Sequence, residues 1–324
     1  MKTAEALRKN SLFKRQKSFS TEAVVGLSYL AFVILMSILS PNFLKMKNLL
    51  NIGQHSAIMG VVSIGMTVVL LTGGIDISVV GIMGITSMMI STMMPAAGSP
   101  FSAILLGLAV GAACGLVNGL LITKGKILPL IATLATSGVY TGFAYLWTNG
   151  ISVAIPNAVF AQIGRGYFLG VPILIYIFVI LFVLFALILK HTPFGRKIYA
   201  VGGNAAAAKL AGINVVNVRL AAYIICGFMA GLGGVLTAAQ NGAGVANANS
   251  GMEMQAISAA ILGGTSLHGG KGRLMGTFIG VLILVTLNNG MNLLGVPTYW
   301  KMVVKGLVLI IAIIVDSIRG GGYE

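Results

Sequence analysis

The segment Phe101–Ile122 reads FSAILLGLAVGAACGLVNGLLI and contains no charged side chain. Such a stretch predicts a transmembrane helix, because about 20 apolar residues are needed to cross a hydrocarbon core of about 30 Å. Glycine occupies every fourth position within it, at Gly107, Gly111, Gly115 and Gly119. Residues four apart share one face of a helix, and glycines there let a neighbouring backbone approach closely. The stripe therefore indicates either ordinary tight packing in a membrane bundle or a surface on which helices slide.

The composition of the whole chain agrees with this segment. Only 8% of the 324 residues are charged and 57% are hydrophobic, whereas a soluble domain has roughly 25% charged residues. The net charge of +15 gathers between apolar runs, which is typical of loops held against an anionic leaflet. The composition excludes a soluble enzyme, a disordered chain and a nucleic-acid binder. It predicts an integral protein of the lipid bilayer.

Ten segments qualify as membrane spans when the chain is divided at its charges and turn residues. They are residues 22–40, 50–72, 78–95, 101–122, 127–147, 171–189, 219–240, 254–267, 274–294 and 298–316. The segment 254–267 is short and rich in Gly and Ser, which predicts a short, broken or re-entrant helix. With the N-terminus inside, 16 of the 21 Lys and Arg residues fall in cytoplasmic segments, as the positive-inside rule requires. We expect an all-α protein of the inner membrane with about ten transmembrane helices and both termini cytoplasmic.

The chain is expected to form one membrane domain between two tails. Residues 1–21 form a basic cytoplasmic tail, residues 22–316 the polytopic domain and residues 317–324 a second cytoplasmic tail. The first apolar run is longer than the core of a signal peptide and lacks a small-residue cleavage site, so we interpret it as a retained helix. Ten spans divide into five plus five, which allows two inverted halves of the kind found in transporters.

No cluster of residues in the sequence suits catalysis. The three histidines are far apart, and three of the six acidic residues lie at or near the chain ends. The segment Gly269–Gly272 has glycine after its lysine, where a nucleotide-binding P-loop requires Ser or Thr. We expect a non-catalytic chain with no cofactor or metal of its own.

Two acidic residues lie beside predicted membrane helices. Asp76 belongs to the turn Gly73–Ser78, and Glu253 begins the eighth span. An ionisable group at membrane depth is a functional candidate by default, which makes Asp76, its neighbour Ser78 and Glu253 candidates for the pathway or gate. The alternative is that each carboxylate caps the start of a helix.

Three asparagines near the end of the ninth span are further pathway candidates. They are Asn288, Asn289 and Asn292. The first and last are four residues apart and share one helix face. Amides suit a neutral polyol, because they donate and accept hydrogen bonds without carrying charge. A hydrogen bond between two helices is the alternative interpretation.

The longest cytoplasmic connection runs from His191 to Arg219 and holds glycines on either side of an alanine-rich helix. Gly212 lies where a helix C-cap would need left-handed backbone. The pattern is typical of a segment that docks a cytoplasmic partner, although a solvated loop on lipid headgroups would share it. The candidate coupling residues are Gly195, Arg196, Gly202, Gly203, Asn204, Ala208, Gly212 and Ile213.

This connection also carries a family resemblance. Residues 195–214, GRKIYAVGGNAAAAKLAGIN, closely resemble the cytoplasmic motif of ribose-type ABC sugar permeases. Further stretches resemble the same family in the same order along the chain: residues 40–43, 48–52, 73–78, 261–272 and 287–296, with Tyr299 and residues 303–306. The family's usual Tyr-Glu-Leu-Asp reads Met-Glu-Met-Gln at residues 252–255, so the sequence does not specify which sugar is carried.

The resemblance implies a permease subunit of a binding-protein-dependent importer. It further implies separate ATPase subunits, which bind the ATP and dock on residues 191–219. A solute-binding protein would deliver the sugar at the outer face, and a second permease copy, identical or paralogous, would complete the pathway. These partners would explain why the chain has no P-loop.

Two other classes of function compete with this interpretation. An ion-coupled secondary transporter also uses helical bundles with inverted halves, but the chain has few carboxylates and histidines for ion coupling. A membrane enzyme ranks below it for lack of a catalytic cluster. Within the family, a nucleoside or autoinducer-type cargo is the alternative to a simple sugar.

Overall fold

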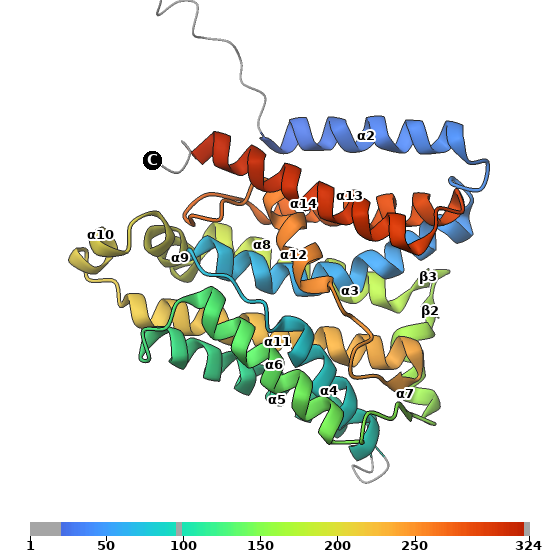
Figure 1. The fold of residues 1–324 in the computed structure, drawn as a ribbon, viewed down its shortest axis with the longest axis horizontal. Helices are drawn as coiled ribbons and strands as arrows, with labels where there is room; N and C mark the ends of the chain where they lie inside the picture. The colour runs from blue at the N-terminus through green and yellow to red at the C-terminus, as the bar shows by residue number, and fades with distance from the viewer. Residues whose placement is uncertain (1–20, 95–98, 321–324) are drawn as a thin grey trace, which may run out of the picture.

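The computed structural model describes residues 21–94 and 99–320, and within them nearly every element is a helix (Figure 1). The long helices are α2 (Thr21–Leu39), α3 (Met46–Leu71), α4 (Val79–Met93), α5 (Pro100–Thr123), α6 (Pro129–Leu146), α8 (Ile173–His191), α11 (Val215–Asn241), α13 (Leu274–Leu293) and α14 (Thr298–Gly320). The shorter helices are α7 (Ala158–Arg165), α9 (Pro193–Gly203), α10 (Ala205–Leu210) and α12 (Met252–Leu262).

The four strands in the described residues have two residues each. β1 (Val153–Ala154) pairs antiparallel with β4 (Ala243–Gly244), which follows α11. β2 (Tyr167–Phe168) and β3 (Val171–Pro172) form a small hairpin before α8. Each pair lies next to the end of a long helix, and neither forms a layer of sheet.

Helix α3 is the centre of the bundle. All residues from Ser56 to Leu71 are buried, and a helix buried on every side must lie inside a larger protein core. Helices α8, α11, α12 and α13 pack around it. In Figure 1, α2 and α14 lie on one side of this core and α4, α5 and α6 on the other.

Each of the ten predicted spans overlaps a helix of the described residues. Five of these helices are long and apolar enough to cross a membrane, namely α3, α5, α8, α11 and α13. The structure is thus that of an all-α membrane protein, and the count of ten crossings stays a prediction. The eighth segment holds only the 11 residues of α12. At 1.5 Å per residue that is about 16 Å, too short to cross the hydrocarbon core alone.

The tail boundaries expected from the sequence fall at the limits of the description. Residues 1–20 of the expected basic tail lie outside the described residues, as do residues 321–324. Helix α14 continues to Gly320, so the expected boundary between residues 316 and 317 falls inside a helix. The expected division of the helices into two inverted halves also stays a prediction.

The two ends of the bundle differ in structure. At one end lie α9, α10, the start of α2 and the end of α14, on the left in Figure 1. The hairpin of β2 and β3 and helix α7 lie at the opposite end. Helix α3 links the two ends, because it starts beside the second and its last residue, Leu71, accepts a hydrogen bond of 3.0 Å from Gly270 beside α9.

Candidate functional site

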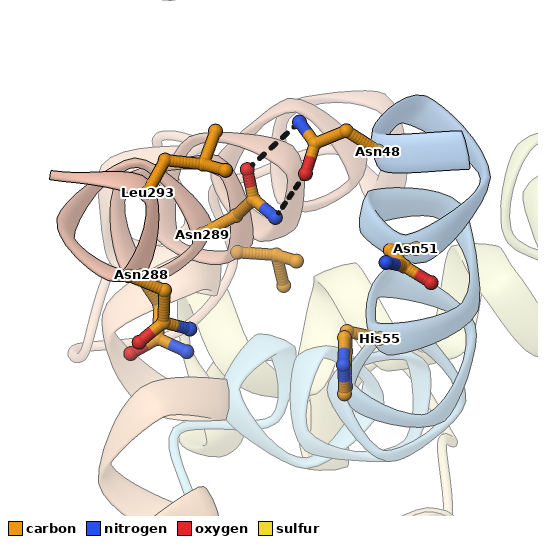
Figure 2. Close-up of a pocket in the computed structure, with 8 residues that line it drawn as sticks. Asn48, Asn51, His55, Asn288, Asn289 and Leu293 are labelled. Carbon is orange, nitrogen blue, oxygen red and sulfur yellow. Dashed lines mark hydrogen bonds between the residues drawn. The ribbon is translucent and has the colours of Figure 1, made fainter. Parts of the chain in front are cut away.

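A pocket of about 280 Å³ lies between the start of α3 and the end of α13 (Figure 2). Its lining is dominated by amides: Asn48, Asn51, Asn288, Asn289 and Asn292, together with His55, Val285 and Leu293. The structure therefore brings all three asparagines predicted from the sequence to one cavity. None of the lining residues carries a carboxylate.

The pocket is closed on one side by a reciprocal pair of amides. The Asn48 Nδ2 donates to Asn289 Oδ1 at 3.1 Å, and Asn289 Nδ2 donates back to Asn48 Oδ1 at 2.8 Å. The Asn48 Nδ2 also donates to the Phe43 carbonyl oxygen at 2.8 Å, and Asn48 is buried. This pairing is the helix–helix hydrogen bond that sequence reasoning offered as the alternative role for the asparagines.

The other predicted asparagines are placed differently. Asn292 is exposed and accepts a hydrogen bond from the Lys301 ammonium group of α14. Asn288 lies on α13 across the pocket from Asn51 and His55, as Figure 2 shows. The pocket thus offers neutral donors and acceptors from two helices, the chemistry that recognises a hydroxyl-rich neutral molecule.

Sequence reasoning missed Asn51 and His55 as members of this site and used Asn48 only as part of a family motif. A signal for them was present. Asn48, Asn51 and His55 are spaced by three and four residues, so they form a polar stripe along one face of an apolar helix. Figure 2 shows that this stripe faces α13.

Asp76 lies in a second, fully buried polar cluster at the turn between α3 and α4. Its Oδ1 accepts hydrogen bonds from Ser78 N at 2.9 Å and Ser78 Oγ at 2.6 Å. The Asn118 Nδ2 of α5 donates to Ser78 Oγ at 2.7 Å, and Tyr140 OH of α6 donates to Asn118 Oδ1 at 3.2 Å. The hydrogen bonds recorded for Asp76 all come from neutral groups.

The arrangement refines the capping interpretation of Asp76. Ser78, and not Asp76, occupies the N-cap position of α4, and Asp76 accepts the Ser78 N–H from two residues before it. The Tyr223 OH of α11 also donates to the Ile75 carbonyl oxygen at 3.2 Å. Asp76 therefore holds one turn against α5 and α11, and it does not face the asparagine pocket.

Glu253 lies in the first turn of α12, where Gly251 is the N-cap residue. Its Oε2 is buried without a hydrogen-bond partner. The residue is separate from both polar clusters described above. Within residues 21–94 and 99–320, no group of three or more His, Cys, Asp or Glu side chains could hold a metal ion.

The predicted coupling residues lie in two short helices joined at Asn204, except for Gly212 and Ile213, which follow the second helix. The Thr192 Oγ1 caps α9 by accepting from Gly195 N at 3.2 Å, and the Asn204 Oδ1 caps α10 by accepting from Ala207 N at 2.9 Å. A Cβ on Gly202 would lie 1.8 Å from the Leu71 carbonyl oxygen. Helix α9 is therefore seated directly on the end of the central helix α3.

The tip of this segment faces outward. Gly203 and Gly212 are exposed, and Leu210, which ends α10, is 91% exposed. Arg196 is also exposed but lies in the first turn of α9, away from this tip. Gly212 has a φ of +78° and lets Ile213 N donate to the Ala208 carbonyl oxygen at 3.0 Å. Ala208 is buried and Ile213 half-buried, so the tip is anchored from beneath and presents an apolar side chain outward.

The glycine stripe of α5 lies against two neighbouring helices. A Cβ on Gly111 would be 2.5 Å from the Gly227 carbonyl oxygen of α11, and one on Gly115 would be 2.3 Å from that of Tyr223. Gly107 faces Ile90 of α4, and Gly119 faces Leu220 of α11. The contact is a close backbone approach, as expected for tight packing of membrane helices.

Comparison with known proteins places the chain in one family. Residues 48–313 match the family described as branched-chain amino acid transport system / permease component. The ribose import permease protein of Bacillus subtilis (strain 168) is 46% identical over 286 residues, which are 88% of this chain and 89% of the relative. The corresponding protein of Escherichia coli (strain K12) is 41% identical over 305 residues, or 93% and 95% of the two chains.

A third relative is named for another sugar. The L-arabinose ABC transporter permease protein of Azospirillum brasilense is 36% identical over 293 residues, which are 90% of this chain and 86% of the relative. No solved structure matches the chain significantly.

Proposed function

The chain belongs to this family of permease components, and from that premise we propose that it is the membrane-spanning subunit of an ATP-driven importer for a ribose-like monosaccharide. The observation that supports a ribose-like cargo is that two of the relatives are named ribose import permeases. The two ribose permeases share more identity with the chain than the arabinose permease does, and each alignment covers most of both proteins.

The asparagine pocket supports a neutral sugar as cargo. A monosaccharide without charge must exchange its hydrogen bonds to water for hydrogen bonds to protein. The pocket supplies amide groups from α3 and α13 and no carboxylate. We place the outer end of the pathway here, because the pocket lies at the opposite end of α3 from the exposed helices α9 and α10.

The cytoplasmic partner is proposed to be an ATPase subunit docked on residues 191–219. The exposed Leu210 and the capped helices α9 and α10 support a rigid knob that can enter a groove of another protein. A solute-binding protein at the outer face and a second permease copy complete the proposed assembly. In this scheme both termini are cytoplasmic and ATP is bound and hydrolysed outside this chain.

Uptake into reconstituted vesicles tests the energy source. Vesicles that hold this chain alone should not accumulate radiolabelled ribose under an imposed proton or sodium gradient. Vesicles that also hold the ATPase subunit, with ATP on its side and the binding protein on the other, should accumulate it. Gradient-driven accumulation by the isolated chain would contradict the proposal and favour a secondary transporter.

A substitution in the pocket tests the cargo site. Asn289→Leu removes an amide of the pocket and should lower ATP-driven ribose uptake at least tenfold. Hydrogen bonds between membrane helices contribute only about 0.6 kcal/mol on average, so the thermal unfolding temperature should change little. Asn42→Ala, at an exposed asparagine in the turn before α3, is the matched control and should leave uptake unchanged. Normal ribose uptake by Asn289→Leu would remove the pocket from the pathway.

A further inference from the structure

A larger cavity, of about 870 Å³, lies away from the asparagine pocket, where α8 ends and α9 and α13 begin. It is lined by two chemically distinct groups of residues. The apolar group includes Phe182 and Leu187 of α8 and Leu274 and Met275 of α13. The polar group is basic and consists of Lys190, His191, Arg196 and Arg273. No acidic side chain is among the residues that line it.

The apolar part of the cavity is continuous with the outward surface of α8. This helix exposes large apolar side chains along its length, among them Ile180, Val183 and Leu184. Within the cavity, Leu187 is 53% exposed and Met275 is 51% exposed. A membrane helix exposes such side chains to lipid tails, so the cavity opens onto the hydrocarbon region.

The basic residues mark the level at which that apolar surface ends. Lys190 and His191 are the last two residues of α8, and Arg273 directly precedes α13. Arg196 comes from the first turns of α9, a third element that reaches the same level. The consecutive helices α8 and α9 and the distant segment before α13 therefore place positive charge at one boundary between apolar and polar surroundings.

Tyr199 fixes the geometry at the back of the cavity. Its hydroxyl donates to the Gly272 carbonyl oxygen at 3.0 Å, which ties α9 to the segment that leads into α13. Burial raises the pKa of Tyr199, and the positive charge of Arg273 opposes that rise. The basic rim is thus built on a hydrogen-bonded frame.

We propose that this cavity binds an anionic phospholipid, with its phosphate on the basic rim and an acyl chain along Leu187 and Met275. Basic pockets between helices at the cytoplasmic boundary suit such headgroups, and long basic side chains there reach the interface while their stems cover apolar surface. The site lies at the foot of α9 and is distinct from the asparagine pocket.

The chemistry of the cavity favours a lipid over its two competitors. A free phosphate would need the basic rim but not the exposed apolar side chains of α8 and α13. A protein docked on the cytoplasmic face would meet Arg196 but would not reach into the hydrocarbon level beside Leu187. A phospholipid satisfies both groups of lining residues at once.

Native mass spectrometry of the purified full chain tests the assignment. The probes are phosphatidylglycerol, phosphatidylcholine with the same acyl chains, and inorganic phosphate. Phosphatidylglycerol should form a retained adduct at concentrations where phosphatidylcholine does not, and inorganic phosphate should form none. A retained phosphate adduct, or equal binding of the two lipids, would overturn the proposal.

A matched pair of double variants locates the binding. Lys190→Gln with Arg196→Gln should weaken phosphatidylglycerol binding roughly thirtyfold, since each basic residue near an anionic membrane surface contributes a factor of about five. Lys197→Gln with Lys209→Gln removes the same charge from exposed positions of α9 and α10 outside the cavity and should bind normally. Equal weakening in both would reveal only general charge attraction and contradict a site.

Addition of the ATPase subunit tests whether a protein partner, and not a lipid, occupies the cavity. If the ATPase subunit covers this cavity, its addition should displace phosphatidylglycerol from the complex. The proposal expects the adduct to survive in the complex of permease and ATPase. Loss of the adduct on assembly would assign the surface to the protein partner.

Discussion

At the scale of single residues, we expect Asp76 to stabilise a turn, because its carboxylate accepts hydrogen bonds from neutral groups. The side chain is fully buried, and its Oδ1 accepts two hydrogen bonds from Ser78. Asn118 and Tyr140 extend these contacts to α5 and α6. A buried acceptor with donors already in place contributes to stability, and its removal leaves those donors unpaired.

Two substitutions at Asp76 separate structure from ion coupling. Asp76→Ala should lower the free energy of unfolding by about 1–3 kcal/mol, because the Ser78 N–H and the neighbouring hydroxyl lose their acceptor. Asp76→Asn keeps an oxygen acceptor and should retain both stability and ATP-driven uptake. Thermal unfolding in detergent and vesicle uptake measure the two effects. Loss of uptake by a stably folded Asp76→Asn protein would show that the charge itself is required.

At the scale of elements, the α5–α11 contact depends on the absence of side chains. Gly115→Val would place a Cβ 2.3 Å from the Tyr223 carbonyl oxygen, so the helices must separate. We expect strongly reduced folded protein in the membrane. Gly142→Val on α6 is the matched control, because a Cβ there meets nothing within 4 Å, and its folded yield should be unchanged. Size-exclusion profiles of the two variants measure the outcome, and equal yields would contradict the close approach.

In the α10–α11 connection, a glycine is required for its backbone conformation and not for close packing. Gly212 has a φ of +78°, but a Cβ there meets nothing within 4 Å, so a side chain would act through the backbone alone. Gly212→Val should cut ATP-driven uptake at least tenfold while the protein remains in the membrane. Gly212→Asn should retain most uptake, since asparagine tolerates left-handed backbone. Unchanged uptake by Gly212→Val would show that this segment does not couple the ATPase to transport.

The same elements show how far the sequence could be interpreted. The glycine spacing in α5 predicted a packed face, because a helix repeats its face every three to four residues. The partner face on α11 could not be assigned, since the residue spacing within one helix does not specify which other helix packs against it. For the same reason, the α13 side of the asparagine pocket was predicted from the sequence and the α3 side was not. Asn289 and Asn48 are 241 residues apart, and only the fold pairs them. The two-residue strands carry too short a pattern to predict.

At the scale of the whole molecule, the distribution of positive charge predicts orientation. The α5–α6 and α12–α13 connections lie at the same end of the bundle as α9 and α10 in Figure 1. Reporter fusions after Gly150 and after Asn249 should read as external, and one after Asn204 as cytoplasmic. Alkaline phosphatase and green fluorescent protein fusions measure the two sides. An external signal after Asn204 would refute the orientation.

Helix α3 touches both of the regions to which we assign function. Its 26 residues span about 39 Å. Asn48 lies in its first turn, and the carbonyl of its last residue, Leu71, lies beneath α9. Residues 56–71 of this helix are all buried, and a closely packed segment transmits displacement along its length instead of absorbing it. Thermodynamic reciprocity then applies: whatever factor the docked ATPase imposes on sugar affinity, sugar must impose on ATPase affinity. Through the central helix, a permease without sugar and one with sugar bound would thus bind the ATPase subunit with different affinities.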